Sequence, residues 1–286
     1  MESSVLTTVL LPVALGVIML GLGLSLTLAD FARVVRYPRP VIVGLSCQMI
    51  LLPAACLLIA EAFGLPPELA VGLMLLAASP GGVTANLFSH LARGDVALNI
   101  TLTAVNSVLS LFSLPIIVNL AMAHFMGDEQ SIPLQLDKVV QVFAIVLVPV
   151  GIGMGLRARW PGLAQHLDRP VKALSAVFLI LVVAASIFQE RHNVVGFIQQ
   201  VGLAALAFNL VSLLVGYVMP RLARVERRQA IAIGMEIGIH NGTLAIAIAS
   251  SPLLLNNSVM AIPAAVYSVL MFFTAAGFGV LVNRRQ

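Results

Sequence analysis

The stretch EIGIHNGT, late in the chain, places an ionisable pair in very apolar surroundings. Glu236 and His240 are four residues apart, which puts them on one face of a helix, and Asn241-Gly242 follows directly. Asn and Gly disfavour a helix interior, so the backbone is expected to break here. A carboxylate, an imidazole and free backbone groups at one place are suited to binding a cation or transferring a proton.

A second helix-breaking stretch, ASPGGVTAN, occupies residues 78–86 and contains a Pro-Gly-Gly sequence. It ends at Asn86, and Asn99 and Thr103 follow four residues apart, on one helix face. With Glu236, these residues supply the carboxylate, amide, hydroxyl and backbone oxygens that a hard cation such as Na⁺ prefers.

The sequence lacks the residue combinations that enzymes use for catalysis. His240 is the only histidine clearly inside an apolar stretch, and no thiolate or second acid accompanies it, so a transition-metal site has no ligand set. No serine–base pair indicates acyl chemistry. Cys47 and Cys56 lie nine residues apart in one apolar run and are interpreted as packing residues. We expect no enzymatic activity and no organic cofactor.

The composition identifies the elements that must position these groups. The chain has 286 residues, of which 60% are hydrophobic and 10% charged, with a mean hydropathy of +1.04. Soluble domains carry about 25% charged residues, so an all-α polytopic membrane protein is predicted. Its start, MESSVLTTVL, lacks a basic region before the apolar residues, so no secretory signal is expected.

Nine transmembrane helices are predicted from apolar stretches of about 20 residues or more. Their approximate ranges are 5–28, 40–62, 67–92, 96–124, 134–157, 170–189, 194–219, 227–251 and 258–282. Because nine is odd, the two termini lie on opposite sides of the membrane.

The basic residues give the orientation, since cytoplasmic loops are enriched in Lys and Arg. Of the 16 basic residues, 14 fall on one side of the predicted spans and only Lys138 and Arg191 on the other. The N-terminus is therefore expected outside and the C-terminus in the cytoplasm, with the chain in the plasma (inner) membrane. This distribution also accounts for the basic pI without a nucleic-acid partner. The 14 are Arg33, Arg36, Arg39, Arg93, Arg157, Arg159, Arg169, Lys172, Arg221, Arg224, Arg227, Arg228, Arg284 and Arg285.

Glu236 is the one acid among twelve that falls inside a predicted span rather than at an edge, loop or terminus. It follows Arg228 by eight residues, about 12 Å along a helix, which places it near the bilayer midplane. A charge there costs at least about 2.5–3.5 kcal/mol and usually marks an ion or substrate pathway. The alternative is a protonated glutamate that serves packing only.

The two interrupted spans, third and eighth, are five spans apart and so cross the membrane in opposite directions. The spans before them match as well: Gln48 precedes Pro53 in one, and Asn209 precedes Pro220 in the other. Interruptions at corresponding positions of two inverted halves indicate a transporter's binding site. Spans 1–4 then mirror spans 6–9, as two five-helix repeats of which the first lacks its opening helix. The alternative is that Pro and Gly are common in membrane helices.

These residues resemble the bile acid:sodium symporter family, also called the sodium/bile acid cotransporter family. The resemblance covers nearly the whole chain and is carried by GLGLSLTLADF, SPGGVTANLFSHLARGDVALNITLTAV and EIGIHNGTLAIAIA. It implies a core domain with two crossed discontinuous helices, at about 40–124 and 194–282. It also implies a panel domain formed by about 5–28, 134–157 and 170–189.

The resemblance implies two sodium sites that share Glu236. The first would use Asn86, Asn99, Thr103 and Glu236, in a family pattern where serine is common at 85 and 99. The second would use Gln48, Glu236, backbone carbonyls near Ile237 and Ile239, and the side chain at 240. The family usually has glutamine there, and this chain has His240.

The substrate would lie between core and panel, against the half-helix N-termini at Val83, Thr84, Asn241 and Gly242. Positive helix-dipole ends there favour an organic anion, such as a bile acid-like carboxylate or a sulfonate. The sequence thus predicts Na⁺-coupled symport of such an anion, and leaves its identity, the stoichiometry and the oligomeric state open. Three alternatives stay open: proton coupling through Glu236 and His240, an arsenite- or auxin-type carrier, and a non-transporting membrane receptor.

Overall fold

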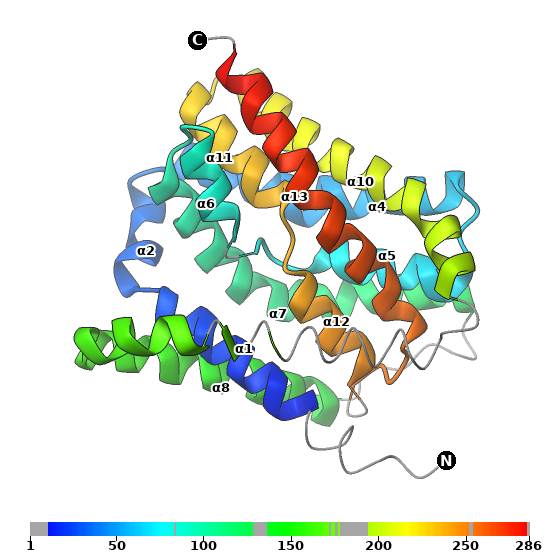
Figure 1. The fold of residues 1–286 in the computed structure, drawn as a ribbon, viewed down its shortest axis with the longest axis horizontal. Coiled ribbons are helices and arrows are strands. Elements are labelled where there is room, and N and C mark those ends of the chain that lie inside the picture. Colours follow the sequence, from blue (N-terminus) through cyan, green and yellow to red (C-terminus); the bar gives the residue numbers. More distant parts are fainter. Residues whose placement is uncertain are drawn as a thin grey trace.

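The computed structural model of the chain describes residues 11–82, 84–127, 136–171, 173–174, 177, 194–251 and 254–284. This part of the chain is almost entirely helical (Figure 1). Its helices are α1 Leu11–Ser25, α2 Leu28–Ala32, α3 Pro38–Ser46, α4 Leu52–Ala62, α5 Pro67–Ala78, α6 Thr84–Leu91, α7 Val96–Met126, α8 Leu136–Arg159, α10 Val194–Leu222, α11 Arg227–Gly238, α12 Gly242–Ser250 and α13 Ile262–Asn283.

Among the described residues, four helices are long and apolar enough to cross a membrane, at Pro38–Ala62, Val96–Met126, Val195–Leu222 and Val259–Asn283. A fifth span is obtained if the pair Gly16–Ser25 and Leu28–Val35, bent by 66°, is taken as one. The chain is therefore a multi-pass membrane protein. The count of nine stays a prediction, since most of the predicted span at 170–189 lies outside the described residues and two others are divided.

The outer faces of the long helices are apolar. Ile42, Leu203 and Phe273 are 62%, 67% and 74% exposed, and Leu120 is 66% exposed. Large apolar side chains exposed along several helices are unfavourable in water and suit a bilayer. The polar side chains that are buried lie inside the helix bundle, so the molecule has the polarity expected of a membrane-embedded protein.

The two predicted interruptions are observed as gaps in the helices. Helix α5 ends at Ala78, and α6 begins at Thr84. Helix α11 ends at Gly238, and α12 begins at Gly242. In Figure 1, α6 and α11 lie toward one end of the molecule, and α5 and α12 lie toward the other. The interruptions meet in the interior, where Gly81 and His240 form an isolated antiparallel β-bridge.

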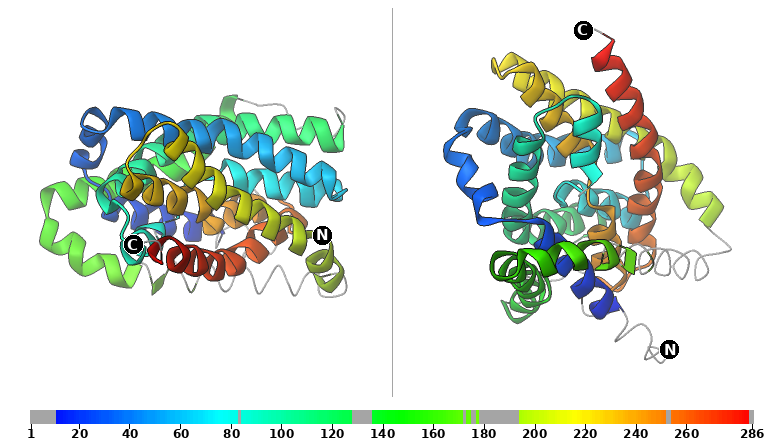
Figure 2. Two further views of the ribbon diagram at one scale, coloured as in Figure 1. Left: turned by 90° about the horizontal axis from the view of Figure 1, so that it is seen from above. Right: turned by 60° about the vertical axis from the view of Figure 1, so that its left-hand side comes forward.

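Helices α1 and α8 form a closely packed pair along one side of the molecule (Figures 1 and 2). A Cβ at Gly23 of α1 would collide with the Val150 backbone of α8, and one at Gly153 would come within 2.6 Å of the Leu20 carbonyl oxygen. Glycine at both positions lets the two backbones approach directly, as is common between membrane helices. On the other side of the interruptions, α10 packs on α11 and α13, and α5 packs on α7.

One end of the molecule gathers three turns that carry basic residues. The Asp95 N–H donates to the Arg228 carbonyl at 2.9 Å. The Arg227 guanidinium donates to the Val282 carbonyl near the end of α13. Turns far apart in the sequence therefore meet on one face of the bundle.

Candidate functional site

The two interrupted helices are joined by their backbones. The Gly82 N–H donates to the Ile239 carbonyl at 2.7 Å, and the Asn241 N–H donates to the Pro80 carbonyl at 2.8 Å. Because an interruption exposes N–H and C=O groups inside an apolar bundle, each must find a partner. Each interruption supplies hydrogen-bond partners for some of the backbone groups of the other, and these bonds fix the point at which the two cross.

Two side-chain amides donate hydrogen bonds to backbone carbonyls near the crossing that the two interruptions do not pair with each other. Gln48 Nε2 donates to the Ser79 carbonyl at 2.9 Å and to the Ala77 carbonyl at 3.2 Å, both at the end of α5. Asn209 Nδ2 donates to the Gly238 carbonyl at 2.9 Å, at the end of α11. These are the two amides whose matching positions the sequence analysis noted, and each serves the interrupted helix that follows it.

Local backbone geometry helps to place Gln48. It lies in a short π-helical segment, Cys47–Leu51, between α3 and α4. Pro53 follows and cannot donate a backbone hydrogen bond to the preceding turn, which favours a local change of helix pitch. Such π segments often occur at functional sites. The segment turns Gln48 into the bundle, where it is 2% exposed.

Glu236 lies beside the crossing and is fully buried. Its Oε2 accepts a hydrogen bond of 2.7 Å from the Thr103 hydroxyl, while its Oε1 has no hydrogen-bond partner. A Cβ at Gly81 would collide with the carboxylate, so Glu236 can occupy this place only because residue 81 is glycine. Among the described residues, no lysine, arginine or histidine forms an ion pair with it. One carboxylate oxygen is thus available inside the bundle.

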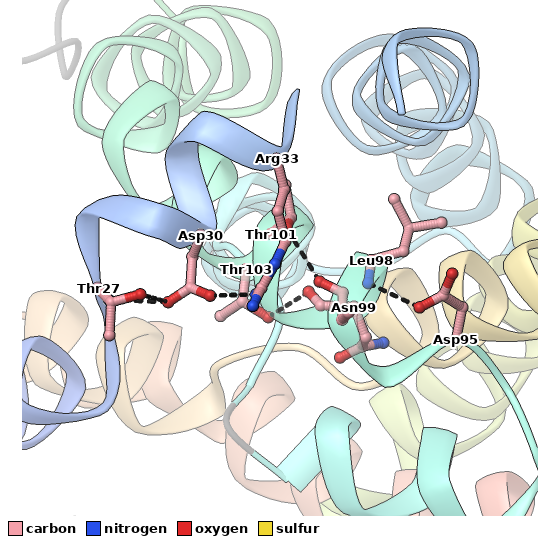
Figure 3. A network of polar contacts seen from close by, with 9 residues as sticks. Thr27, Asp30, Arg33, Asp95, Leu98, Asn99, Thr101 and Thr103 are labelled. Carbon is pink, nitrogen blue, oxygen red and sulfur yellow. Dashed lines mark hydrogen bonds and ion pairs between the residues drawn. The ribbon is translucent and has the colours of Figure 1, made fainter. Parts of the chain in front are cut away.

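The predicted first sodium site contains further oxygens without a partner. Asn99 Nδ2 donates to the Ala232 carbonyl at 2.7 Å, one turn before Glu236 on α11, and leaves its own Oδ1 unpartnered. Asn86 Oδ1, from α6, is also buried and unpartnered. Figure 3 shows Asn99 and Thr103 one turn apart on α7. Buried oxygens without donors are costly, and a monovalent cation would satisfy several of them at once.

The predicted second sodium site is built differently. Gln48 Oε1 is buried without a partner. The His240 ring stacks on Phe208, with centroids 5.6 Å apart, and meets Tyr267 edge-on at 5.4 Å. His240 Nδ1 lies 3.3 Å from the Ser79 carbonyl, and its Nε2 has no partner.

Aromatic packing thus fixes the imidazole ring where the resemblance expects an amide. Ile237 and Ile239 are both fully buried. The Ile239 carbonyl already accepts the hydrogen bond from Gly82. The residues present therefore offer fewer oxygens to a cation than those around Thr103 do.

The predicted substrate residues are placed only in part. Val83 lies outside the described residues. Thr84, the first residue of α6, is exposed, and Gly242 is buried against Ser268. Asn241 is half-buried, and its Oδ1 accepts from the Leu244 N–H at 3.0 Å, so it caps α12 and keeps its Nδ2 as a donor.

A narrow pocket beside the crossing was not anticipated residue by residue. It lies between α1, α2, α7, α8, α12 and the first interruption, with a volume of about 20 Å³, roughly that of one water. An organic anion would therefore need the surrounding helices to move apart. Its lining is mainly apolar and includes Leu22, Leu26, Pro80, Ser107, Ser110, Val150 and Leu244.

Two groups of residues were missed by sequence reasoning. Phe208 and Tyr267, which hold the His240 ring, look like ordinary core aromatics in the sequence. Asn106 is fully buried, and neither of its amide atoms has a hydrogen-bond partner. It follows Thr103 by three residues, so the helical spacing that linked Asn99 to Thr103 extends to Asn106 as well.

The sequence of this chain is similar to a known protein family and to several of its relatives. The family model described as the Sodium Bile acid symporter family matches residues 9–197. A "Probable sodium/metabolite cotransporter BASS1, chloroplastic" of Arabidopsis thaliana is 27% identical over 258 residues, covering 90% of this chain and 62% of the relative. The chain thus spans less than two thirds of that relative.

Two further relatives come from distant organisms. An "Uncharacterized sodium-dependent transporter YocS" of Bacillus subtilis is 26% identical over 255 residues, which cover 89% of this chain and 77% of the relative. An "Ileal sodium/bile acid cotransporter" of Oryctolagus cuniculus is 25% identical over 243 residues, covering 84% of this chain and 69% of the relative.

Proposed function

The chain belongs to the Sodium Bile acid symporter family, a family of membrane transporters rather than enzymes, and from this premise we propose that it couples Na⁺ to the symport of an organic anion. One observation carries the proposal. Glu236 is a fully buried acid whose Oε2 accepts a single hydroxyl hydrogen bond and whose Oε1 is unpartnered. With the unpartnered oxygens of Asn86 and Asn99 nearby in the fold, this is a ligand set for a hard monovalent cation.

An inverted repeat supports transport by alternating access. The bridge pairs Gly81 with His240, an offset of 159 positions. Adding 159 to 67–78 and 84–91 gives 226–237 and 243–250, close to the observed bounds of 227–238 and 242–250. Adding it to 96–126 gives 255–285, which contains α13. Two repeats of the same arrangement that cross at their interruptions can open the site alternately to one side of the membrane and to the other.

The close pairing of α1 with α8 supports their assignment to a panel that moves against the core. We place the body of the substrate in the pocket between these helices and α7, with its anionic group toward Asn241 and Thr84. The Asn241 amide nitrogen and the N-terminus of α12 are donors that suit an anionic group. The apolar lining suits the body of an organic molecule rather than a small inorganic anion.

The meeting of the turns at Asp95, Arg228 and Val282 supports the proposed orientation, with this basic end of the molecule in the cytoplasm. In that orientation, α11 runs from the cytoplasmic side to the crossing, and α12 runs from the crossing to the outer side.

The test compares thermal unfolding of purified protein in Na⁺ and in K⁺ at equal ionic strength. A ligand at 100 times its Kd stabilises the folded state by about 2.7 kcal/mol, so Na⁺ should raise the Tm of the wild type. Glu236→Gln should remove that rise. Glu226→Gln is the control, because Glu226 is exposed at the start of the same helix and makes no capping hydrogen bond. A wild type that responds equally to Na⁺ and K⁺ between about pH 6 and pH 8 contradicts sodium coupling.

Proton coupling is a second candidate, favoured by the unpartnered Nε2 of His240, which follows Glu236 by four residues and lies in the interruption after α11. In proteoliposomes, a Na⁺ gradient at constant pH and a pH gradient without Na⁺ separate the two. Sodium coupling predicts uptake of an organic anion only with the first, and proton coupling predicts uptake with the second.

A further inference from the structure

Asn106, on α7, is a buried polar residue whose carboxamide makes no hydrogen bond of good geometry. It is 0% exposed, and both Nδ2 and Oδ1 lack a partner among the described residues. A buried carboxamide is normally bonded at both ends, because no water can replace the missing partners. Neither sodium coupling as argued above nor helix packing accounts for the polar side chain at this position.

Its neighbours are those of the candidate sodium site. Asn106 lies one turn beyond Thr103, whose hydroxyl contacts Glu236 Oε2, and its carboxamide lies next to the Glu236 carboxylate. The two side chains are therefore neighbours, and each carries an oxygen without a hydrogen-bond partner, Oδ1 of Asn106 and Oε1 of Glu236. With Asn99 one turn on the other side of Thr103, three polar residues of α7 follow one helix face toward α11.

We propose that Asn106 is a further residue of the cation site and that its Oδ1 binds the coupling ion together with Glu236 Oε1. This rests on the proposed function. A cation bound by the two oxygens satisfies both at once. A hydrogen bond from Asn106 Nδ2 to Glu236 would not, since it leaves the buried Oδ1 without a partner. The site then draws oxygens from three successive turns of α7, at Asn99, Thr103 and Asn106.

The test measures the apparent Kd for Na⁺ by thermal unfolding of wild type, Asn106→Leu and Asn106→Asp. Leucine has a similar size but no oxygen, so Na⁺ affinity should fall roughly 10-fold or more. The Tm without Na⁺ should not fall, because no hydrogen bond is lost. Aspartate keeps the oxygen and adds charge, so it should still bind Na⁺ and show a Tm rise at least as large as that of the wild type.

Thr101→Val is the matched control. Thr101 is fully buried on the same helix, and its hydroxyl donates within the helix to the Ala97 carbonyl at 2.9 Å. It should leave Na⁺ affinity unchanged.

Two results overturn the assignment of Asn106. The first is an unchanged Na⁺ Kd in Asn106→Leu. The second is loss of the Na⁺ response in Asn106→Asp, which would identify Asn106 as a hydrogen-bond donor to Glu236. Failure of the proposed function is distinguishable from both, because the wild type itself would then show no Na⁺ response.

Discussion

The Thr103 hydroxyl donates a 2.7 Å hydrogen bond to Glu236 Oε2, between residues 133 positions apart in the sequence. The contact joins α7, a continuous helix, to the end of α11, beside the crossing of the two interrupted helices. It directs the carboxylate so that one oxygen is held by the protein and the other is left open. A protein that only needed to bury a neutral glutamate would be expected to pair both oxygens.

We therefore expect Thr103→Val to weaken Na⁺ binding. Valine keeps the branched shape but removes the hydroxyl, so Glu236 loses the hydrogen bond to its Oε2 and the site loses an oxygen. Apparent Na⁺ affinity should fall on the order of 10-fold, measured from the Na⁺ dependence of the Tm. Thr103→Ser keeps the hydroxyl and should restore most of the affinity. Equal loss in both variants would show that the methyl group, not the hydroxyl, matters.

Gly81→Ala should disturb both folding and ion binding. A Cβ at this position would collide with the Glu236 carboxylate, and overpacking of a core typically costs about 1–3 kcal/mol. Denaturant or thermal unfolding in K⁺ measures the stability change, and addition of Na⁺ measures the response. Gly277→Ala is the control, since a Cβ there meets nothing within 4 Å. It should be neutral or slightly stabilising within α13.

Asn209 and Tyr267 should act together in holding the end of α11. Both donate to the Gly238 carbonyl, at 2.9 Å and 3.0 Å. Asn209→Ala and Tyr267→Phe should each destabilise the protein by about 1–2 kcal/mol. Because they share one acceptor, the double variant should deviate from additivity by at least about 0.5 kcal/mol. Strict additivity in unfolding experiments would mean that the two hydrogen bonds support different parts of the structure.

Asn241→Asp should remove substrate binding while keeping the fold. Aspartate retains the oxygen that caps α12 and favours a helix N-terminus. It also places a negative charge where the anionic group of the substrate is proposed to lie. Uptake of an organic anion into proteoliposomes should be lost, and Na⁺ should still raise the Tm. Asn241→Ser keeps a capping oxygen without charge and should retain transport, unless the Nδ2 donor is itself essential.

His240→Gln should change how steeply transport or stability depends on Na⁺. The imidazole stacks on Phe208 and supplies a nitrogen where the family resemblance expects an amide oxygen. Glutamine offers that oxygen beside the unpartnered Gln48 Oε1. We expect the Hill coefficient for Na⁺ to rise from about 1 toward 2, measured in the uptake assay. A coefficient already near 2 in the wild type would mean that the histidine does not displace a second ion.

Much of the fold and part of the site follow from the sequence alone, because their causes are local. Composition indicates membrane helices, and Pro-Gly-Gly and Asn-Gly interrupt a helix wherever they occur. The observed ends of the helices on either side of the interruptions, at Ala78 and Thr84 and at Gly238 and Gly242, lie within the predicted stretches. The first and last residues of α7 and α10 lie within three positions of the predicted ranges. The burial of Glu236 likewise follows from its distance to the nearest basic residue along one helix.

What only the tertiary structure decided is which polar atoms meet and which remain unpartnered. The sequence noted Gln48 and Asn209 as matching amides, but their targets, the ends of α5 and α11, lie about 30 residues further on. It did not single out Asn106, because the sequence does not show whether an asparagine in a helix has hydrogen-bond partners. Hydrogen bonds between residues distant in the chain depend on how the helices cross, and no local pattern of residues contains that information.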